Sequence, residues 1–440
     1  MKTSTFQLLI LVAFGMLTLG GVVIFAMSGG LNGSGGTGPV TIWGTTDDDT
    51  MQSLLATMRQ ADKTTFDKVQ YIRKDKATYT NDLINAMASG NGPDLFMVTQ
   101  DMVTQFSDKI TIIPYSSVTQ ASYLNAYIDE GQLFLTPQGT LALPLSVDPL
   151  VMYWNRDMFS TAGIAKPPVT WNDFLDQAPR ITVLDTGNNV KKSAVALGEW
   201  SNIRYAKDIV ATLFMQAGDP IVSRDASTGK PMPVLGTTPQ GASENPAASA
   251  LQFYTEFANP TKTIYSWNRA LPESQNKFVT GDLAVYFGRA SDYAVIAERN
   301  PNLRFSVALL PQIKGNSTQM TFGQLTGLSI SRVSPNPNGA LAVAQKLTSQ
   351  AAISTLAGLA PLPPVRRDVE VDTSTNAAAA VFIQSALIAR GWLDPDAAAT
   401  DKAFGDMIQS VVSGKEVPST AVFNTSQILG TLLHTNTIQN

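Results

Sequence analysis

The sequence predicts an α/β protein in which one membrane-spanning helix precedes a mainly parallel sheet covered by helices. Two observations carry this prediction. A long uncharged apolar segment, Phe6–Met27, opens the chain, and after it short apolar runs alternate with amphipathic helical patterns. Strands that alternate with helices are typical of parallel sheets whose faces are covered by those helices. About 400 residues follow the apolar segment, which fits two domains or one large two-lobed unit.

The apolar segment is long enough to cross a membrane. As a helix it would span roughly 33 Å at about 1.5 Å per residue, and a bilayer core is about 30 Å thick. Lys2 precedes it and the next charge is Asp47, so we expect the N-terminus inside and the rest outside. Residues 1–28 are therefore predicted to be a single-pass anchor in the cell membrane. A signal peptide cleaved after Ser28 is the alternative.

Composition excludes several classes of protein. The chain has no Cys, so it has no disulfide, no thiol nucleophile and no Cys for lipid attachment. One His, His434, rules out a cluster of His ligands for a metal, and we expect neither metal nor cofactor. The net charge of −4 argues against a nucleic-acid partner. Residues 29–38 are mostly Gly, Ser, Thr and Asn, the composition of a flexible linker.

The first elements follow in a strand–helix order. Strands are expected at 40–43, 69–72 and 95–98, where short apolar runs are bounded by polar residues. Between them, apolar residues recur at helical spacing over 51–58 and 79–87. The acidic trio at 47–49 immediately precedes the first helix, where a cap and the positive end of the helix dipole favour carboxylates.

The later elements repeat this style. Thr170 and Asp173 have the spacing of a capping box, and Asn245 with Pro246 forms a typical helix start. A long apolar helical face runs over 203–217. Strands are expected at 283–287, 305–310 and 325–330, a helix at 340–347, and mainly helices from 377 onward.

Several segments, in order, resemble the extracellular solute-binding proteins of ABC importers, in the maltose-binding-protein-like group (family 1). The resemblance covers roughly 40–367. Its most specific stretch is LPLSVDPLVMYWNRDMFSTAGIAKPPVTWNDF, and it also includes VTIWG, ASGNGPDLFMV, FVTGDLAVYFGRASDY, LLPQ, GLSISRVSPNPNGALAVAQKLTS and APLPPVRRD.

The resemblance implies a two-lobed α/β fold of the periplasmic-binding-protein-like type II, with crossover strands that act as a hinge. Lobe 1 would comprise 39–147 and 310–358, and lobe 2 would comprise 148–309 and 359–440. The family's mechanism implies that the lobes close over a small solute. It also implies that a monomer, held outside the cell membrane by its helix, delivers that solute to the permease subunits of an ABC importer.

Candidate ligand residues come first from lobe 1 and the first crossover. Trp43 ends a strand, where ligands sit in open α/β sheets, although packing within the lobe is the alternative. Asp47 could accept hydrogen bonds from hydroxyls, with a helix cap or a calcium ligand as alternatives. The resemblance places Asp94 near the cleft, with a carboxylate that stabilises a turn as the alternative, and Asp148 lies at the first crossover. Strand alternation allows only one of Tyr153 and Trp154 to face it, and we select Tyr153.

Further candidates lie in lobe 2 and the return crossover. They occupy loops or strand ends that resemble ligand-contacting segments of the family, and Gly288 would permit close backbone approach. These candidates are Glu199, Trp200, Trp267, Asn268, Gly288, Arg289, Tyr293 and Gln324.

Aromatic residues beside carboxylates and amides suit a sugar or oligosaccharide, because ring faces pack on C–H surfaces while polar groups hold hydroxyls. A polyamine or a peptide-like solute is the alternative within the same fold. No nucleophilic triad is predicted, because His434 lies near the chain end. We therefore expect a binding protein and not an enzyme. An anchored glycoside hydrolase, which needs only two carboxylates, is the alternative from another class.

Overall fold

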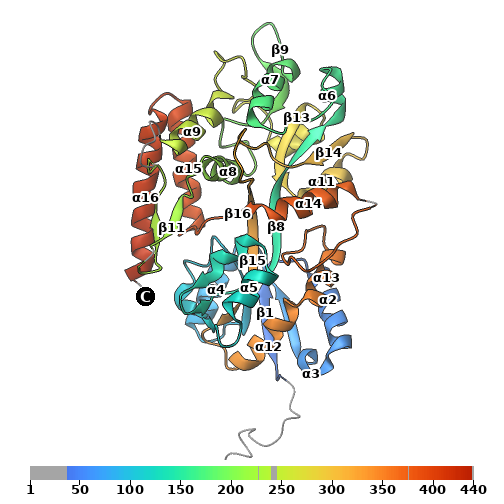
Figure 1. The fold of residues 1–440 in the computed structure, drawn as a ribbon, viewed down its shortest axis with the longest axis vertical. Helices are drawn as coiled ribbons and strands as arrows, with labels where there is room; N and C mark the ends of the chain where they lie inside the picture. Colours follow the sequence, from blue (N-terminus) through green and yellow to red (C-terminus); the bar gives the residue numbers. More distant parts are fainter. Residues whose placement is uncertain (1–36, 226, 239–244, 375, 439–440) are drawn as a thin grey trace, which may run out of the picture.

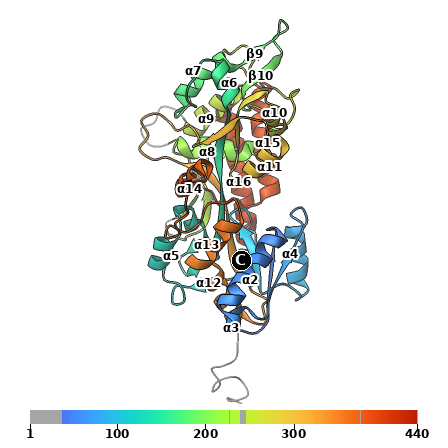
Figure 2. The same cartoon turned by 90° about the vertical axis from the view of Figure 1, so that its right-hand side faces the viewer.

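The computed structural model describes residues 37–438 except 226, 239–244 and 375. They form two α/β lobes, one above the other, joined by long strands that run vertically between them (Figure 1). The view from the side shows the same division, with helices on both sides of the central strands (Figure 2). The predicted membrane helix and most of the linker lie outside the described residues. Within those residues, no helix is both long and apolar enough to cross a membrane.

Lobe 1 confirms the predicted strand–helix alternation. Its first strands pair in parallel in the order β2-β1-β3, and β15 (Thr321–Ser331) pairs antiparallel with β3. A small sheet lies beside this one in the order β5-β7-β6. The elements are β1 (Val40–Gly44), α2 (Asp48–Ala61), α3 (Lys63–Phe66), β2 (Val69–Arg73), α4 (Tyr79–Ala88), β3 (Leu95–Thr99), η1 (Ser107–Lys109), β4 (Ile110–Thr111), β5 (Ile113–Pro114), α5 (Gln120–Ala126), η2 (Asp129–Phe134), β6 (Leu135–Thr136), β7 (Gly139–Thr140), α12 (Pro337–Leu347) and α13 (Gln350–Leu359).

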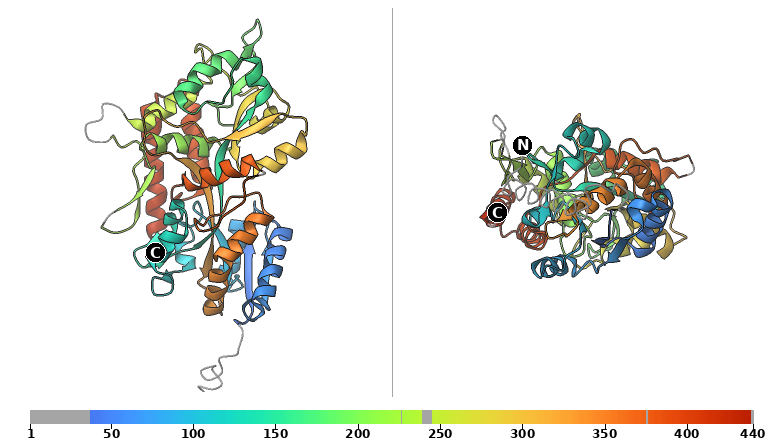
Figure 3. Two further views of the ribbon diagram at one scale, coloured as in Figure 1. Left: turned by 45° about the vertical axis from the view of Figure 1, so that its right-hand side comes forward. Right: turned by 90° about the horizontal axis from the view of Figure 1, so that it is seen from below.

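Lobe 2 continues the same sheet, which is mixed and not mainly parallel as predicted, because β8 (Leu143–Asn155) and β15 pair antiparallel with strands of both lobes. There β13 pairs antiparallel with β8 and parallel with β10. Helices α15 and α16 pack on each other and on α9, and α16 runs down the side of the molecule toward lobe 1 (Figure 3). The elements are α6 (Arg156–Thr161), α7 (Trp171–Ile181), β9 (Val183–Leu184), β10 (Val190–Val195), α8 (Ala206–Gln216), β11 (Val222–Arg224), β12 (Pro231–Pro233), α9 (Pro246–Glu256), α10 (Ser274–Val279), β13 (Leu283–Arg289), α11 (Asp292–Arg299), β14 (Phe305–Ala308), α14 (Ala377–Leu387), β16 (Ala389–Arg390), α15 (Ala397–Val412) and α16 (Pro418–Ile438).

The two lobes share strands β8 (Leu143–Asn155) and β15 (Thr321–Ser331). The first half of β8 pairs with β15, and its second half pairs with β13 and β14. The change of partner falls next to Asp148, which lies opposite Gln324, while Leu150 lies opposite Arg289. Residues at this change of partner are therefore at the junction of the lobes.

The return to lobe 1 begins later than the predicted position, residue 310. The backbone of Trp171 donates to the Gln312 carbonyl at 3.1 Å, so this segment still belongs to lobe 2. The chain crosses at β15, which begins at Thr321. The last passage was predicted at 359, but Val365 still accepts a hydrogen bond from Ile128 of lobe 1 at 3.1 Å. Helix α14 then packs on β8 and β14 in lobe 2.

Helix starts follow the predicted capping chemistry. The Asp47 carboxylate accepts from the Thr50 backbone N–H at 3.3 Å at the start of α2. Thr170 and Asp173 form the reciprocal capping box of α7. The Asn245 side chain caps α9 by accepting from the Ala248 N–H at 3.1 Å. The predicted helix starts are confirmed. At each one, the cap accepts a hydrogen bond from a backbone N–H that the helix itself leaves unpaired.

Candidate functional site

A cavity of about 440 Å³ lies between the lobes, beside the point where β8 changes partner. In open α/β sheets, ligands bind outside the carboxyl ends of strands, and both β3 and β13 end here. The cavity is lined by Lys76, Gln100, Asp101, Trp200, Ser201, Ile203, Tyr205, Ala206, Lys207, Asp208, Arg289, Phe322, Gln324, Trp392, Asp394, Ala397 and Asp401.

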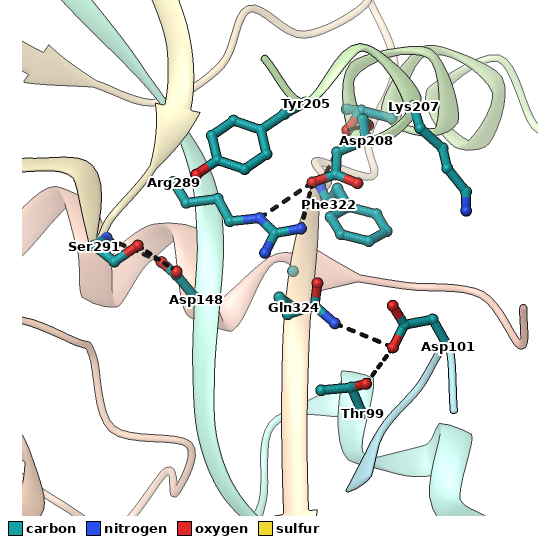
Figure 4. A network of polar contacts seen from close by, with 12 residues as sticks. Thr99, Asp101, Asp148, Tyr205, Lys207, Asp208, Arg289, Ser291, Phe322 and Gln324 are labelled. Carbon is teal, nitrogen blue, oxygen red and sulfur yellow. Dashed lines mark hydrogen bonds and ion pairs between the residues drawn. The ribbon is translucent and has the colours of Figure 1, made fainter. Parts of the chain in front are cut away.

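The lobe 2 wall contains a buried ion pair between α8 and the end of β13. Two side-chain nitrogens of Arg289 donate to the same carboxylate oxygen of Asp208, Oδ2. Nη2 lies 2.7 Å from this oxygen and Nε lies 3.1 Å from it (Figure 4). The guanidinium carbon of Arg289 also lies 4.7 Å from the centre of the Tyr205 ring. Burial alone would lower the pKa of Arg289, but the Asp208 and Asp148 carboxylates outweigh it and raise that pKa. The pair is therefore a fixed charged surface.

A second charged cluster joins α8 to the start of α15. The Lys207 ammonium lies 2.7 Å from Asp394, 2.7 Å from the Thr400 hydroxyl and 2.8 Å from Asp401. The same ammonium is 5.6 Å from the centre of the Trp392 ring. Burial raises the pKa of Asp394 to about 6, and Lys207 opposes this rise. Lys207 thus fixes the loop after β16 against α8.

The lobe 1 wall is smaller and is built on the loop after β3. The Gln100 amide donates to the Gly323 carbonyl at 2.8 Å, and its oxygen accepts from the Leu325 N–H at 2.9 Å. Asp101 accepts from the Thr99 hydroxyl, and the Gln324 amide lies 3.5 Å from the same carboxylate oxygen (Figure 4). These contacts attach the lobe 1 wall to the crossover strand β15.

Aromatic side chains complete the lining. Trp200 is half-buried, and α15 makes room for it at Gly405, where an added Cβ would lie 2.9 Å from the indole nitrogen. Trp392 stacks on Phe404 with centroids 5.8 Å apart. Trp200 and the half-buried Tyr205 therefore keep partly accessible aromatic surface beside the charged groups.

Three of the predicted ligand residues line this cavity, namely Trp200, Arg289 and Gln324. Asp148 lies just behind them. Its carboxylate accepts from the Ser291 N–H at 3.0 Å and from the Ser291 hydroxyl at 2.6 Å (Figure 4). Burial raises the pKa of Asp148. Asp148 therefore holds the turn that follows Arg289 and is not part of the cavity lining.

The predicted residues of the first lobe lie elsewhere. The Lys74 ammonium covers the Trp43 ring at 3.6 Å from its centre, and Asp47 caps α2. Asp94 is buried, where its carboxylate accepts from the Thr41 N–H at 2.8 Å and from the Ser334 hydroxyl. Asp94 therefore joins β1 to the loop after β15 and does not face the cavity.

Several predicted residues of lobe 2 are part of its core. Tyr153 is fully buried, and its hydroxyl donates to the Arg289 carbonyl at 2.7 Å. Trp154 packs edge-on against Phe159, so neither member of this pair lines the cavity. Trp267 is fully buried and donates to Asn202 at 3.0 Å. Strand alternation was a poor guide here because both faces of this strand are covered.

The remaining predicted residues also serve packing. Buried Glu199 is 3.4 Å from Arg269, and Asn268 donates to the Tyr265 hydroxyl at 2.8 Å. Gly288 is required because an added Cβ would lie 2.3 Å from the Tyr286 ring. The ring of Tyr293 packs on Phe305 and Phe382, with centroids 5.4 and 5.9 Å away.

Most of the charged lining was not predicted from the sequence, although some of these residues carried a signal. Asp101 follows a predicted strand at its carboxyl end, the same position that singled out Trp43. Trp392 and Asp394 lie in a loop between helical segments and carried a weaker signal. Lys207 and Asp208 had none, because their positions on a long amphipathic helix are typical of a solvated face.

The model of the bacterial extracellular solute-binding protein family matches residues 56–383. Among curated proteins, a binding protein of Brucella abortus (strain 2308) is 23% identical over 233 residues, which are 52% of this chain and 52% of the relative. A binding protein of Brucella suis biovar 1 (strain 1330) matches to the same extent. The chain thus spans about half the length of the curated relatives it matches.

Solved structures are similar over nearly the whole chain. The cyclic α-maltosyl-1,6-maltose binding protein from Arthrobacter globiformis has a TM-score of 0.73 at 17% identity, covering 90% of this chain and 99% of that one. A cyclo/maltodextrin-binding protein complexed with maltotetraose has a TM-score of 0.70 at 16% identity, covering 89% and 96%. UgpB from Mycobacterium tuberculosis, in complex with glycerophosphocholine, has a TM-score of 0.68 at 17% identity, covering 91% and 99%. This likeness shows the two-lobed periplasmic-binding-protein-like fold.

Proposed function

Because the chain belongs to the bacterial extracellular solute-binding proteins, we propose that it captures a sugar or oligosaccharide in the cavity between its lobes. The family is one of binding proteins and not of enzymes, so the glycoside hydrolase alternative is set aside. The lobes would close on the solute by a hinge movement at β8 and β15. The closed form would then deliver the solute to the permease subunits of an ABC importer.

The observation that carries this proposal is the composition of the cavity. Partly accessible aromatic rings, Trp200 and Tyr205, lie beside carboxylate and amide groups. Sugars present apolar C–H faces together with hydroxyls, so such a lining suits both parts of the molecule. Asp208 and Asp394 are already paired with cations, which favours a neutral solute. Three of the similar structures are bound to maltotetraose, tagatose and cycloalternan.

A polyamine is the second candidate, because the carboxylates of the lining outnumber its cations. Asp101, Asp208, Asp394 and Asp401 face Lys76, Lys207 and Arg289. Carboxylates and aromatic faces would both attract ammonium groups. A peptide-like solute would use the same groups at its amino end.

The remaining parts of the proposal concern the membrane. We infer that residues 1–28 anchor a monomer at the outer face of the cell membrane, with residues 29–38 as its tether. The long apolar segment supports an anchor, and an extracellular family supports the outer face. Protease treatment of intact cells would test this: we expect loss of the folded part while the membrane fraction keeps the N-terminal fragment.

A thermal-shift screen tests the solute class. The full-length protein in detergent would be melted with maltotetraose, tagatose, spermidine, a tripeptide and glycerophosphocholine. We expect a sugar to raise the melting temperature, because a ligand at 100 times its Kd adds about 2.7 kcal/mol to the free energy of unfolding. A rise with spermidine or the tripeptide alone would replace the sugar proposal by the corresponding alternative. Conversion of a sugar to products would contradict a pure binding role.

A further inference from the structure

Glu130 in η2 is a buried carboxyl group with no polar partner. The residue is 1% exposed. Among the described residues, neither carboxylate oxygen has a hydrogen-bond partner. An ionised carboxylate in such a place would lose its hydration without compensation, which is one of the most costly arrangements in a protein interior. Burial accordingly raises the pKa of Glu130 to about 8.

Two glycines enclose this carboxyl group. A Cβ added to Gly323 would lie 2.2 Å from Oε2, and one added to Gly391 would lie 2.7 Å from Oε1. Gly323 belongs to the crossover strand β15, and Gly391 directly follows β16, which leads into α15 of lobe 2. Glu130 itself belongs to lobe 1. The carboxyl group is thus covered by backbone from the crossover and from the other lobe, at the place where the lobes would turn.

The charged neighbours do not neutralise it. Arg390 on β16 donates to Asp129 at 2.7 Å and to the Ala389 carbonyl at 2.7 Å, and Arg367 also pairs with Asp129. Arg289 is paired with Asp208. These two side chains act on the Glu130 carboxyl group only through long-range electrostatic interactions. Strand β15 carries no charged residue, and α5 faces η2 with the neutral Tyr123. The nearby cations are therefore occupied by other carboxylates.

We propose that Glu130 is a proton-linked latch of the hinge, protonated in the described arrangement of the lobes and ionised when lobe movement lifts Gly391 away and admits water. Each such movement then releases one proton. The proposal rests on the lobe movement proposed above. High pH favours the arrangement in which Glu130 is hydrated, and low pH favours the arrangement described here.

The direct test is the distance between the lobes as a function of pH. The chain has no Cys, so spin labels can be placed at S53C on α2 and S160C on α6, two exposed positions in different lobes. Pulsed electron–electron double resonance would give the distribution of distances between the two labels, without any solute, from pH 6.5 to pH 9.5. We expect a second population to grow as the pH rises from 6.5 to about 8, by up to about tenfold per pH unit for one linked proton, and to level off above about pH 8, where Glu130 is ionised in both arrangements.

Variants identify the group responsible. E130Q is neutral and nearly isosteric, so its distribution should be the same at both ends of the pH range. E298Q, an exposed change on α11, should keep the wild-type response. A wild-type distribution that does not change with pH, or an E130Q distribution that changes as the wild type does, would overturn the proposal. Failure of sugar to change the distance would instead count against the proposed function, because the pH series contains no sugar.

Discussion

The two walls of the cavity differ in how their charges are held. On lobe 2, Arg289 with Asp208 and Lys207 with Asp394 form short ion pairs whose side chains are at least 87% buried. On lobe 1, Lys76 is exposed, and Asp101 is held by a hydroxyl and an amide. Rigid pairs keep their positions without a ligand, whereas an exposed side chain must be ordered on binding. Lobe 2 therefore offers a preformed surface, and in the proposed closure lobe 1 would add its contacts.

The largest expected effect comes from breaking a lobe 2 pair. Replacing Asp208 by Ala leaves the buried Arg289 guanidinium unpaired, so the free energy of unfolding should fall by about 3–5 kcal/mol. Urea denaturation measures this. D401N is the matched control, because Asp401 is largely exposed and an exposed pair contributes about 1 kcal/mol or less. The double variant D208L/R289M should recover most of the loss. Equal stability of D208A and D401N would mean that the lobe 2 wall is not built on this pair.

The next effect concerns Trp43 and Trp200, which are both predicted from the sequence to contact the solute. W200A removes aromatic surface from the cavity and should weaken sugar binding by at least about tenfold, or about 1.4 kcal/mol. W43A should stay within about twofold of wild type, because Trp43 is covered by Lys74 away from the cavity. Isothermal titration with the sugar from the thermal-shift screen gives both values. Weaker binding by W43A alone would move the site to lobe 1.

The smallest effect is expected on the lobe 1 wall. D101N keeps the shape of the side chain and its contact with Gln324, so its loss of affinity should be about two- to fivefold, and its stability should match wild type. K76A at the rim should behave similarly, because the side chain is exposed. The same titrations measure both. A loss from D101N as large as that from W200A would show that the two walls contribute equally.

Much of the fold could be predicted from the sequence because its signals are local. The cap of Asp47 and the box of Thr170 with Asp173 each act within four residues, and apolar spacing marks one helix or strand at a time. The crossover was harder to delimit. Residue 310 looks like the end of a strand. Only the hydrogen bonds from Trp171 of α7 to Gln312 and from Gln216 of α8 to Pro311 place the following segment in lobe 2.

The site depends on contacts that local patterns do not contain. Lys207 meets Asp394 across 187 positions of the chain, and no periodicity indicates that pairing. Tyr153 was selected by strand alternation and Trp267 by the resemblance of its loop to a ligand-contacting one. Each is nevertheless fully buried, with its polar atom satisfied inside lobe 2. Residue type and position along a strand therefore selected residues near the cavity but not the side chains that face it.

We infer that the solute binds between the lobes, against the preformed lobe 2 wall. A crystal structure of the protein in complex with the sugar identified by the thermal-shift screen tests this inference. We predict a sugar ring packed on Trp200, with hydroxyls bonded to the groups around Asp208 and Arg289 and fewer bonds to Gln100 and Asp101. A sugar bound on the outer face formed by α9, α15 and α16, or one held mainly by lobe 1, would contradict this placement of the solute.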